Sequence, residues 1–170
     1  CKSARIAGLK VDSKNFQSAA EYMNKAARGK GYAASLQAKD ADPRSTMAAA
    51  AARLMLGYKP EQVRDAVRWA FTEGLKNDLF GKKLDAEFVY FGTMASFQVG
   101  GDDWKKWNVE MKKALVSIQR QGGPKDGSVN DVDGSWPVAA DAPQLGALYT
   151  SALFQLTLEV YYRYLPIYTK

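Results

Sequence analysis

Apolar side chains recur at helical spacing along most of the chain, and two kinds of helix alternate. One kind has a single apolar face, because apolar residues return every three or four positions while charged residues fill the other positions. The other kind is apolar on nearly all sides, which is typical of a helix buried in a core. The predicted one-faced helices span 13–28, 60–76 and 102–120, and the predicted buried helices span 45–56, 86–99 and 146–164.

Caps, prolines and glycines predict where these helices begin and end. Asp12-Ser13 and Ser45-Thr46 precede apolar periodic runs and are typical N-caps. Pro60 suits the first turn of a helix, where no backbone N–H is needed. Residues 88–91, taken alone, fit a strand as well as a helix, because short aromatic runs are ambiguous. The continuation of the apolar pattern to Gly100 favours a helix.

The connections between the helices also repeat. Glycines at positions 8, 57 and 100 each precede a one-faced helix, and they are 49 and 43 residues apart. Thr93-Met94-Ala95 and Thr150-Ser151-Ala152 mark matching points 57 residues apart, the excess being a Gly-rich insertion. Periods of this size indicate stacked helical hairpins. We therefore predict one all-α domain over residues 1–170, with an inner layer of buried helices and an outer layer of one-faced helices.

Composition excludes several classes of function. The net charge of +6 is spread along the chain, whereas nucleic-acid binding needs a concentrated basic face, so we expect no nucleic-acid partner. The chain has no histidine and one cysteine, which excludes a His-based triad, a His-containing zinc site and an internal disulfide. The most apolar run, 145–158, is too short to span a bilayer, so we expect no transmembrane segment.

Several stretches resemble a known family. The run Asp133-Gly134-Ser135-Trp136, after Gln119, resembles the repeat of terpenoid cyclases and protein prenyltransferases. Stretches 90–101, 104–108 and 158–166 are similar to bacterial prenyltransferase/squalene oxidase repeat-containing proteins. The resemblance covers nearly the whole chain and implies an α/α toroid, here partial, with about three and a half helical hairpins. It also implies that residues 1–5 are the tail of an inner helix and that the chain is the C-terminal part of a longer protein.

The chemistry of that family is incompletely represented. Its cyclases use an Asp-x-Asp-Asp motif, and the nearest match here is Asp131-Val132-Asp133-Gly134, where Gly134 replaces the last acid. Asp131 and Asp133 are thus weak catalytic candidates, because a Gly-rich loop does not desolvate a carboxyl group. Turn formation is the alternative role for these acids. The zinc ligands of the prenyltransferases are missing, so we expect no metal and no cofactor, although Asp126 and Asn130 beside these acids leave calcium open.

Large aromatic residues are the remaining candidates for a ligand site. An apolar cavity for a lipid or isoprenoid is one use for them, and packing of the core is the other. Trp136, in a rigid turn before Pro137, also suits a staple that fills the gap between hairpins and donates its indole N–H to the backbone. The cavity candidates are Tyr90, Phe91, Phe97, Trp136, Tyr149 and Phe154.

Two functions follow as hypotheses. The first is a non-catalytic scaffold or protein-interaction module, which the incomplete catalytic motifs favour, and its partners are proteins in a larger assembly. The second is an isoprenoid- or lipid-binding protein or a terpenoid-cyclase-like enzyme, so whether the chain is an enzyme stays open. The location also stays open: the sequence slightly favours a periplasmic or secreted protein, and Cys1 leaves a lipid anchor as an alternative to an internal start.

Overall fold

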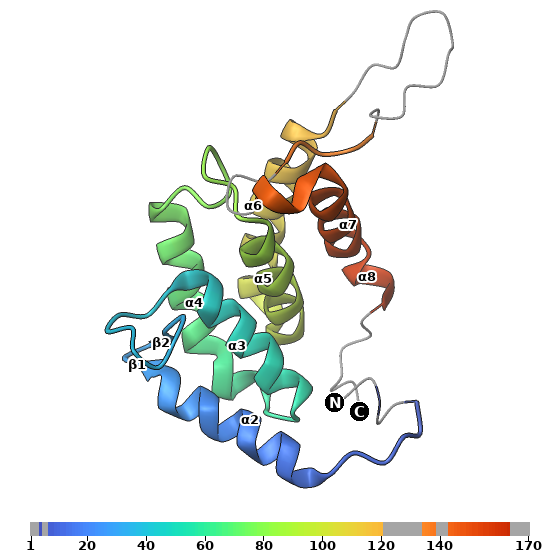
Figure 1. Cartoon of the computed structure of the whole chain (residues 1–170). Coiled ribbons are helices and arrows are strands. Elements are labelled where there is room, and N and C mark those ends of the chain that lie inside the picture. The colour runs from blue at the N-terminus through green and yellow to red at the C-terminus, as the bar shows by residue number, and fades with distance from the viewer. Residues whose placement is uncertain (1–3, 5–6, 121–133, 139–142, 164–170) are drawn as a thin grey trace, which may run out of the picture.

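The computed structural model describes residue 4 and residues 7–120, 134–138 and 143–163. This part of the chain is mostly helical, which confirms the all-α prediction (Figure 1). The helices are α2 (Ser13–Ala26), α3 (Pro43–Met55), α4 (Pro60–Lys76), α5 (Ala86–Val99), α6 (Gly101–Ile118), α7 (Gly146–Leu158), α8 (Val160–Arg163) and the short 3₁₀ helix η1 (Pro143–Leu145).

Helices α4 and α5 begin and end at the predicted residues. Pro60 opens α4, and the side chain of Gln62 accepts a hydrogen bond from the Lys59 N–H at 2.7 Å. Asp85 caps α5 by accepting from the Phe88 N–H at 2.7 Å. Gly100, at φ 69°, then ends α5 and leads directly into α6. Residues 88–91 are therefore helical, as predicted.

The predicted cap of α3 is wrong. The helix starts at Pro43, two residues before Ser45, and Asp42 is the N-cap, with its carboxylate accepting from the Ser45 N–H at 2.7 Å. Thr46 is instead buried inside the helix, where its hydroxyl accepts from the Tyr32 N–H at 2.8 Å. The prediction failed because Asp, Ser and Thr are all good caps and they occur close together here.

A small antiparallel hairpin follows α2 and was not predicted. Strand β1 (Ala27–Arg28) pairs with β2 (Gly31–Tyr32), and Gly29, at φ 57°, lies in the turn between them. Gly31 has no Cβ, which lets the Trp69 ring pack against it; a Cβ there would lie 2.5 Å from Trp69 Cζ3. The predicted helix 13–28 is therefore two residues too long, because residues 27 and 28 form β1, and strands of two residues carry no periodicity of their own.

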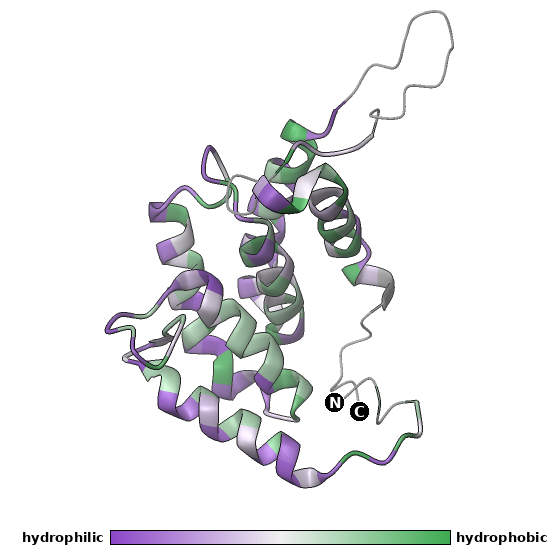
Figure 2. Cartoon of the chain, in the orientation of Figure 1, coloured by the Kyte–Doolittle hydropathy of each residue, from purple (hydrophilic) through white to green (hydrophobic). Residues whose placement is uncertain are grey.

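Helices α3, α5 and α7 form a row (Figure 1). Helix α5 lies between the other two and packs against both. Helix α4 packs against α3 and α5, and α6 packs against α5, so these two are flanking helices. Figure 2 shows apolar residues concentrated on the row and polar residues on α2 and the flanking helices, as the alternating pattern predicted.

The core lies between the row and the flanking helices. Trp107 of α6 is fully buried and packs on Gly92 of α5, where a Cβ would lie 2.0 Å from its ring. The indole N–H of Trp107 donates to the Thr93 hydroxyl at 2.8 Å. Gly74 of α4 likewise leaves space for the Phe88 ring. Glycines at these two helical positions therefore let large aromatic side chains approach the neighbouring backbone.

Candidate functional site

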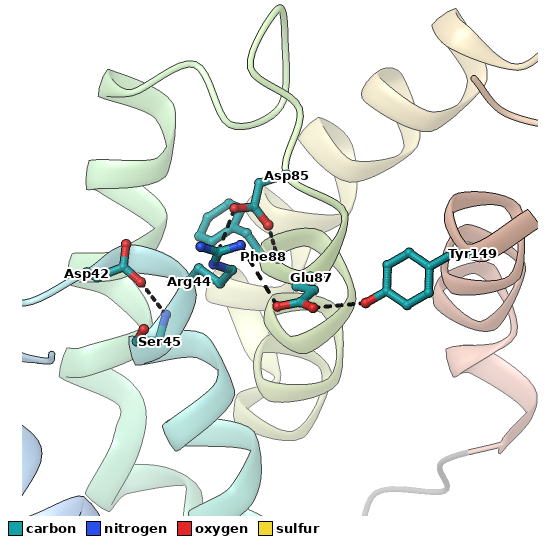
Figure 3. A network of polar contacts seen from close by, with 7 residues as sticks. All are labelled: Asp42, Arg44, Ser45, Asp85, Glu87, Phe88 and Tyr149. Carbon is teal, nitrogen blue, oxygen red and sulfur yellow. Dashed lines mark hydrogen bonds and ion pairs between the residues drawn. The ribbon is translucent and has the colours of Figure 1, made fainter. Parts of the chain in front are cut away.

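A polar network joins the amino-terminal ends of the three row helices (Figure 3). Arg44 in the first turn of α3 pairs with Asp85 (Nε–Oδ2 3.6 Å) and with Glu87 (Nη1–Oε2 4.0 Å). The Tyr149 hydroxyl of α7 donates to Glu87 Oε1 at 2.9 Å. Since all three contacts involve early turns of their helices, α3, α5 and α7 run parallel and start at the same end.

The acids of this network are engaged in structural contacts. Asp85 is buried, and it both caps α5 and pairs with Arg44. A buried carboxylate needs such partners, because burial without them carries a large desolvation cost. Glu87 and Arg44 are partly exposed, so their ion pair contributes little free energy on its own. The network is therefore suited to fixing the register of the row.

Three of the aromatic candidates lie on one side of α5, which we call the α5 stripe: Tyr90, Phe91 and Phe97. They are only partly buried, whereas the residues on the opposite side of the helix are buried against the flanking helices. The rings of Tyr90 and Phe91 meet edge to face, with centroids 5.2 Å apart. Partly exposed aromatic rings beside one another offer an apolar contact surface.

Phe97 extends the α5 stripe into a second aromatic group. Its ring packs edge to face on Trp104 at 5.2 Å and on Tyr161 at 6.5 Å. The Lys112 ammonium lies 5.5 Å from the centre of the Tyr161 ring, and the Tyr161 hydroxyl donates to Asn108. This end of the stripe is therefore flanked by a cation and an amide.

Trp136 and Phe154 belong to the core instead. The Trp136 side chain is 3% exposed and meets the Phe154 ring at 5.8 Å. Its indole N–H donates to the Leu115 carbonyl at 2.9 Å, and its backbone N–H donates to the Ser151 hydroxyl at 3.0 Å. These contacts join α6 to α7, which confirms the predicted role of Trp136 as a staple between hairpins.

The structure brings the six cavity candidates together only in part. Tyr90 and Phe91 touch, Phe97 lies further along the same helix, and Tyr149 contacts Glu87 through its hydroxyl. Asp126, Asn130, Asp131 and Asp133 lie outside the described residues. Among the residues that are described, no three acidic or thiol side chains gather into a metal site.

Three clefts among the described residues lie away from these aromatics. A groove of about 410 Å³ separates α2 from α3, and its walls are almost wholly apolar. A cleft of about 270 Å³ lies between α6 and the end of α4 with the loop that follows it, and it mixes Leu75 and Phe80 with Asp78, Glu110 and Lys113. The third, of about 20 Å³, has room for about one water molecule. No helix in the described part of the chain has both the length and the apolar character that crossing a bilayer requires.

Arg44, Glu87 and the α2–α3 groove were not predicted. Arg44 and Glu87 are both the second residue of their helix. Aligning the first residues of the helices would have placed Arg44 and Glu87 side by side, but only once the row itself was known.

Comparison of the chain with protein-family models, with curated proteins and with solved structures gave no match. The arrangement of helices and side chains is therefore the basis for a functional proposal.

Proposed function

We propose that the chain is a non-catalytic helical-repeat scaffold that binds a protein partner through the α5 stripe. The observation that carries this proposal is the partial exposure of Tyr90, Phe91 and Phe97 on the central helix of the row. Aromatic side chains dominate binding energy at protein interfaces, because they bury large areas at a small entropic cost. A polar rim beside an apolar centre is also typical of such interfaces, and Glu87, Gln98 and Lys112 lie in suitable places for it.

We further propose that the row is the inner layer of a partial α/α toroid of the prenyltransferase/squalene oxidase repeat kind. The parallel row and its flanking helices support this arrangement, because they repeat one hairpin unit. In such a toroid the α5 stripe faces the centre. Small-angle X-ray scattering tests the arrangement: a curved row fits a toroidal segment, whereas a globular, uncurved envelope contradicts it.

The contacts of buried Asp85 and half-buried Asp103 support a non-catalytic role. Asp85 is held by a cap and by Arg44, and Asp103 is held by Arg64 at 3.6 Å and by Arg68 at 2.8 Å. A general acid must be free to reach a substrate, whereas these two carboxylates are already engaged by backbone N–H or guanidinium donors. These two carboxylates are therefore poorly suited to protonating a substrate.

A lipid- or isoprenoid-binding role is the second candidate, and the apolar character of the same stripe favours it. The two proposals differ in what they expect at Asp131 and Asp133. If the chain turns over a polyprenyl substrate, and Asn at both positions abolishes that turnover, the scaffold proposal is overturned. A scaffold that binds only protein shows no saturable binding of a fluorescent farnesyl probe.

Photo-crosslinking from the α5 stripe tests the scaffold proposal. A benzophenone side chain replaces Phe97 in one variant and Val109 in a matched control, because Val109 is 63% exposed on α6. We expect position 97, and not position 109, to capture a defined partner protein from the native extract. That partner is then purified and titrated against the unlabelled chain. Equal capture from both positions, or no binding by the purified partner, contradicts the proposal.

A further inference from the structure

Helix α2 carries an apolar face that is covered much less than the equivalent face of α4. Phe16, Ala20 and Met23 are the fourth, eighth and eleventh residues of α2. The same positions of α4 are Val63, Val67 and Ala70, and all three are buried. Of the three positions in α2, only Met23 is buried, and the neighbouring Ala19 and Tyr22 are exposed. The two helices thus share a pattern, but only α4 has it covered by row helices.

This less covered face of α2 forms one wall of the α2–α3 groove. Phe16, Ala19 and Tyr22 of α2 face Ala52, Met55 and Leu56 at the end of α3 across a volume of about 410 Å³. In the next unit along the chain, α3 itself packs against both α4 and α5. The α2–α3 groove is therefore the place in the repeat that a row helix would occupy.

At the other end of the row, α7 exposes apolar side chains that could fill such a groove. Leu145 is 46% exposed, Leu148 is 85% exposed, and Ala152 is also exposed one turn further on. Each of the other row helices, α3 and α5, has the next row helix packed against it on the carboxyl-terminal side of the repeat. Helix α7 has the sequence character of a row helix, and these residues form a bare apolar ridge on it, the α7 ridge.

We propose that these two surfaces bind each other between copies of this chain. The α7 ridge of one copy lies in the α2–α3 groove of the next, so that α7 contacts α2 and α3 there as α3 contacts α4 and α5 within one copy. The packing between row helices then continues across the boundary between molecules. This inference rests on the proposed repeat but uses a surface separate from the α5 stripe.

The polar ends of the two surfaces are also complementary. Because successive helices of the repeat are antiparallel, the carboxyl end of α7 would meet the first turn of α2. Gln155 and Glu159 lie at that end of α7, and Lys14 and Asn15 lie in the first turn of α2, directly after its N-cap Asp12, so that the Lys14 ammonium would meet the Glu159 carboxylate. The contact joins two different surfaces, so it is head-to-tail and leaves a free groove and a free ridge at the ends of each assembly.

Sedimentation velocity of the whole chain tests the proposal. We expect the wild-type chain to associate as its concentration rises from about 1 µM to about 1 mM, a range that covers typical weak interfaces. Leu148→Asp blocks the ridge and Ala19→Glu blocks the groove, and each alone should weaken association at least about tenfold. Both positions are exposed, so these changes should leave folding intact, which circular dichroism checks. Val109→Asp, on the exposed face of α6, is the matched control and should associate like wild type.

Mixing the two variants gives the sharpest result. The Ala19→Glu copy keeps its ridge and the Leu148→Asp copy keeps its groove, so one contact remains. We expect an equimolar mixture to form a dimer and nothing larger. A wild-type chain that stays monomeric at every concentration, a mixture that stays monomeric, or a Leu148→Asp variant that associates like wild type would each overturn the proposal. Failure of the α5 stripe to capture a partner would leave this self-association proposal intact. The scaffold proposal and the self-association proposal can therefore fail separately.

Discussion

The carboxylate of Glu87 is shared between Tyr149 and Arg44, which belong to the helices on either side of α5. One oxygen accepts from the Tyr149 hydroxyl at 2.9 Å, and the other lies 4.0 Å from Arg44 Nη1. Apolar packing along a row tolerates sliding, whereas the hydrogen bond from Tyr149 is directional and, together with the Arg44 ion pairs to Asp85 and Glu87, does not. The shared carboxylate therefore sets the relative height of α3, α5 and α7.

Removal of the Tyr149 hydroxyl tests this contact. We expect Tyr149→Phe to lower the free energy of unfolding by about 1 kcal/mol, the usual net value of one hydrogen bond. Glu87→Gln should have a similar effect, and the double variant should lose less than the sum, because the two groups form one contact. Urea denaturation measures all three. Tyr22→Phe, at an exposed position of α2, is the control, and an equal loss there would contradict the assignment.

The buried hydroxyls of Thr93 and Ser96 should respond in opposite ways to removal. Thr93 accepts from the Trp107 indole, so Thr93→Val leaves a buried N–H without its partner and should cost about 1–3 kcal/mol. The Ser96 hydroxyl is buried and has no hydrogen-bond partner among the described residues. Ser96→Ala should therefore be neutral or stabilising by up to about 1 kcal/mol. Chemical denaturation measures the free energy of unfolding of both variants. A larger loss for Ser96→Ala than for Thr93→Val would contradict this prediction.

Trp136 should contribute to stability through both its ring and its indole N–H. Trp136→Phe keeps most of the ring but loses the bond to the Leu115 carbonyl, so we expect a loss of about 1–2 kcal/mol. Trp136→Ala also opens a cavity beside Phe154 and should cost about 3–5 kcal/mol. Thermal unfolding gives the order of the two effects. Equal midpoints for the wild type and Trp136→Ala would show that the staple is not needed.

Alkaline pH should destabilise the fold through Tyr32. Burial raises the pKa of Tyr32 above its ordinary value of 10.0, and this outweighs the opposite pull of the Arg53 guanidinium. The folded chain then keeps this proton where the unfolded chain has lost it. The contribution of the protonated Tyr32 hydroxyl to the free energy of unfolding is therefore fully present below about pH 10. It is lost as the pH rises through the raised pKa.

The variant Tyr32→Phe isolates this effect and keeps a ring beside Arg53, whose guanidinium lies 5.2 Å from the ring centre. The free energy of unfolding of the wild type should fall relative to that of Tyr32→Phe as the pH rises above about 10. Guanidinium titrations at several pH values measure the difference. A difference that stays constant over this range would contradict the raised pKa.

The helices were predictable because local signals agree with the packing. The one-sided pattern of α4 and the all-round apolar pattern of α5 are each bounded by a strong signal, Pro60 in one case and Gly100 in the other. The cap of α3 was not predictable, because three capping residues compete within five positions. The last predicted helix, 146–164, breaks at Glu159 into α7 and α8, and nothing in the apolar pattern marks that residue.

The candidate site was less predictable than the fold. Tyr90 and Phe97 share a helix face, which helical spacing alone places, and Trp136 was recognised from its rigid turn. The contact of Glu87 with Tyr149 joins residues 62 positions apart, and it depends on how high one helix sits against the next. The exposure of the α7 ridge depends on how the other helices pack around α7. Neither relation is encoded in the periodicity of a single segment.

The affinity of the captured partner for variants of the α5 stripe tests the scaffold proposal most directly. Isothermal titration calorimetry would compare the wild type with the double variant Tyr90→Ser/Phe97→Ser and with the control Val109→Ser/Val116→Ser, whose positions are exposed on α6. We predict that the stripe variant binds at least about a hundredfold more weakly, as expected when two aromatic anchors are lost, and that the control binds like wild type. Unchanged affinity of the stripe variant, or an equal loss in the control, would contradict the proposal.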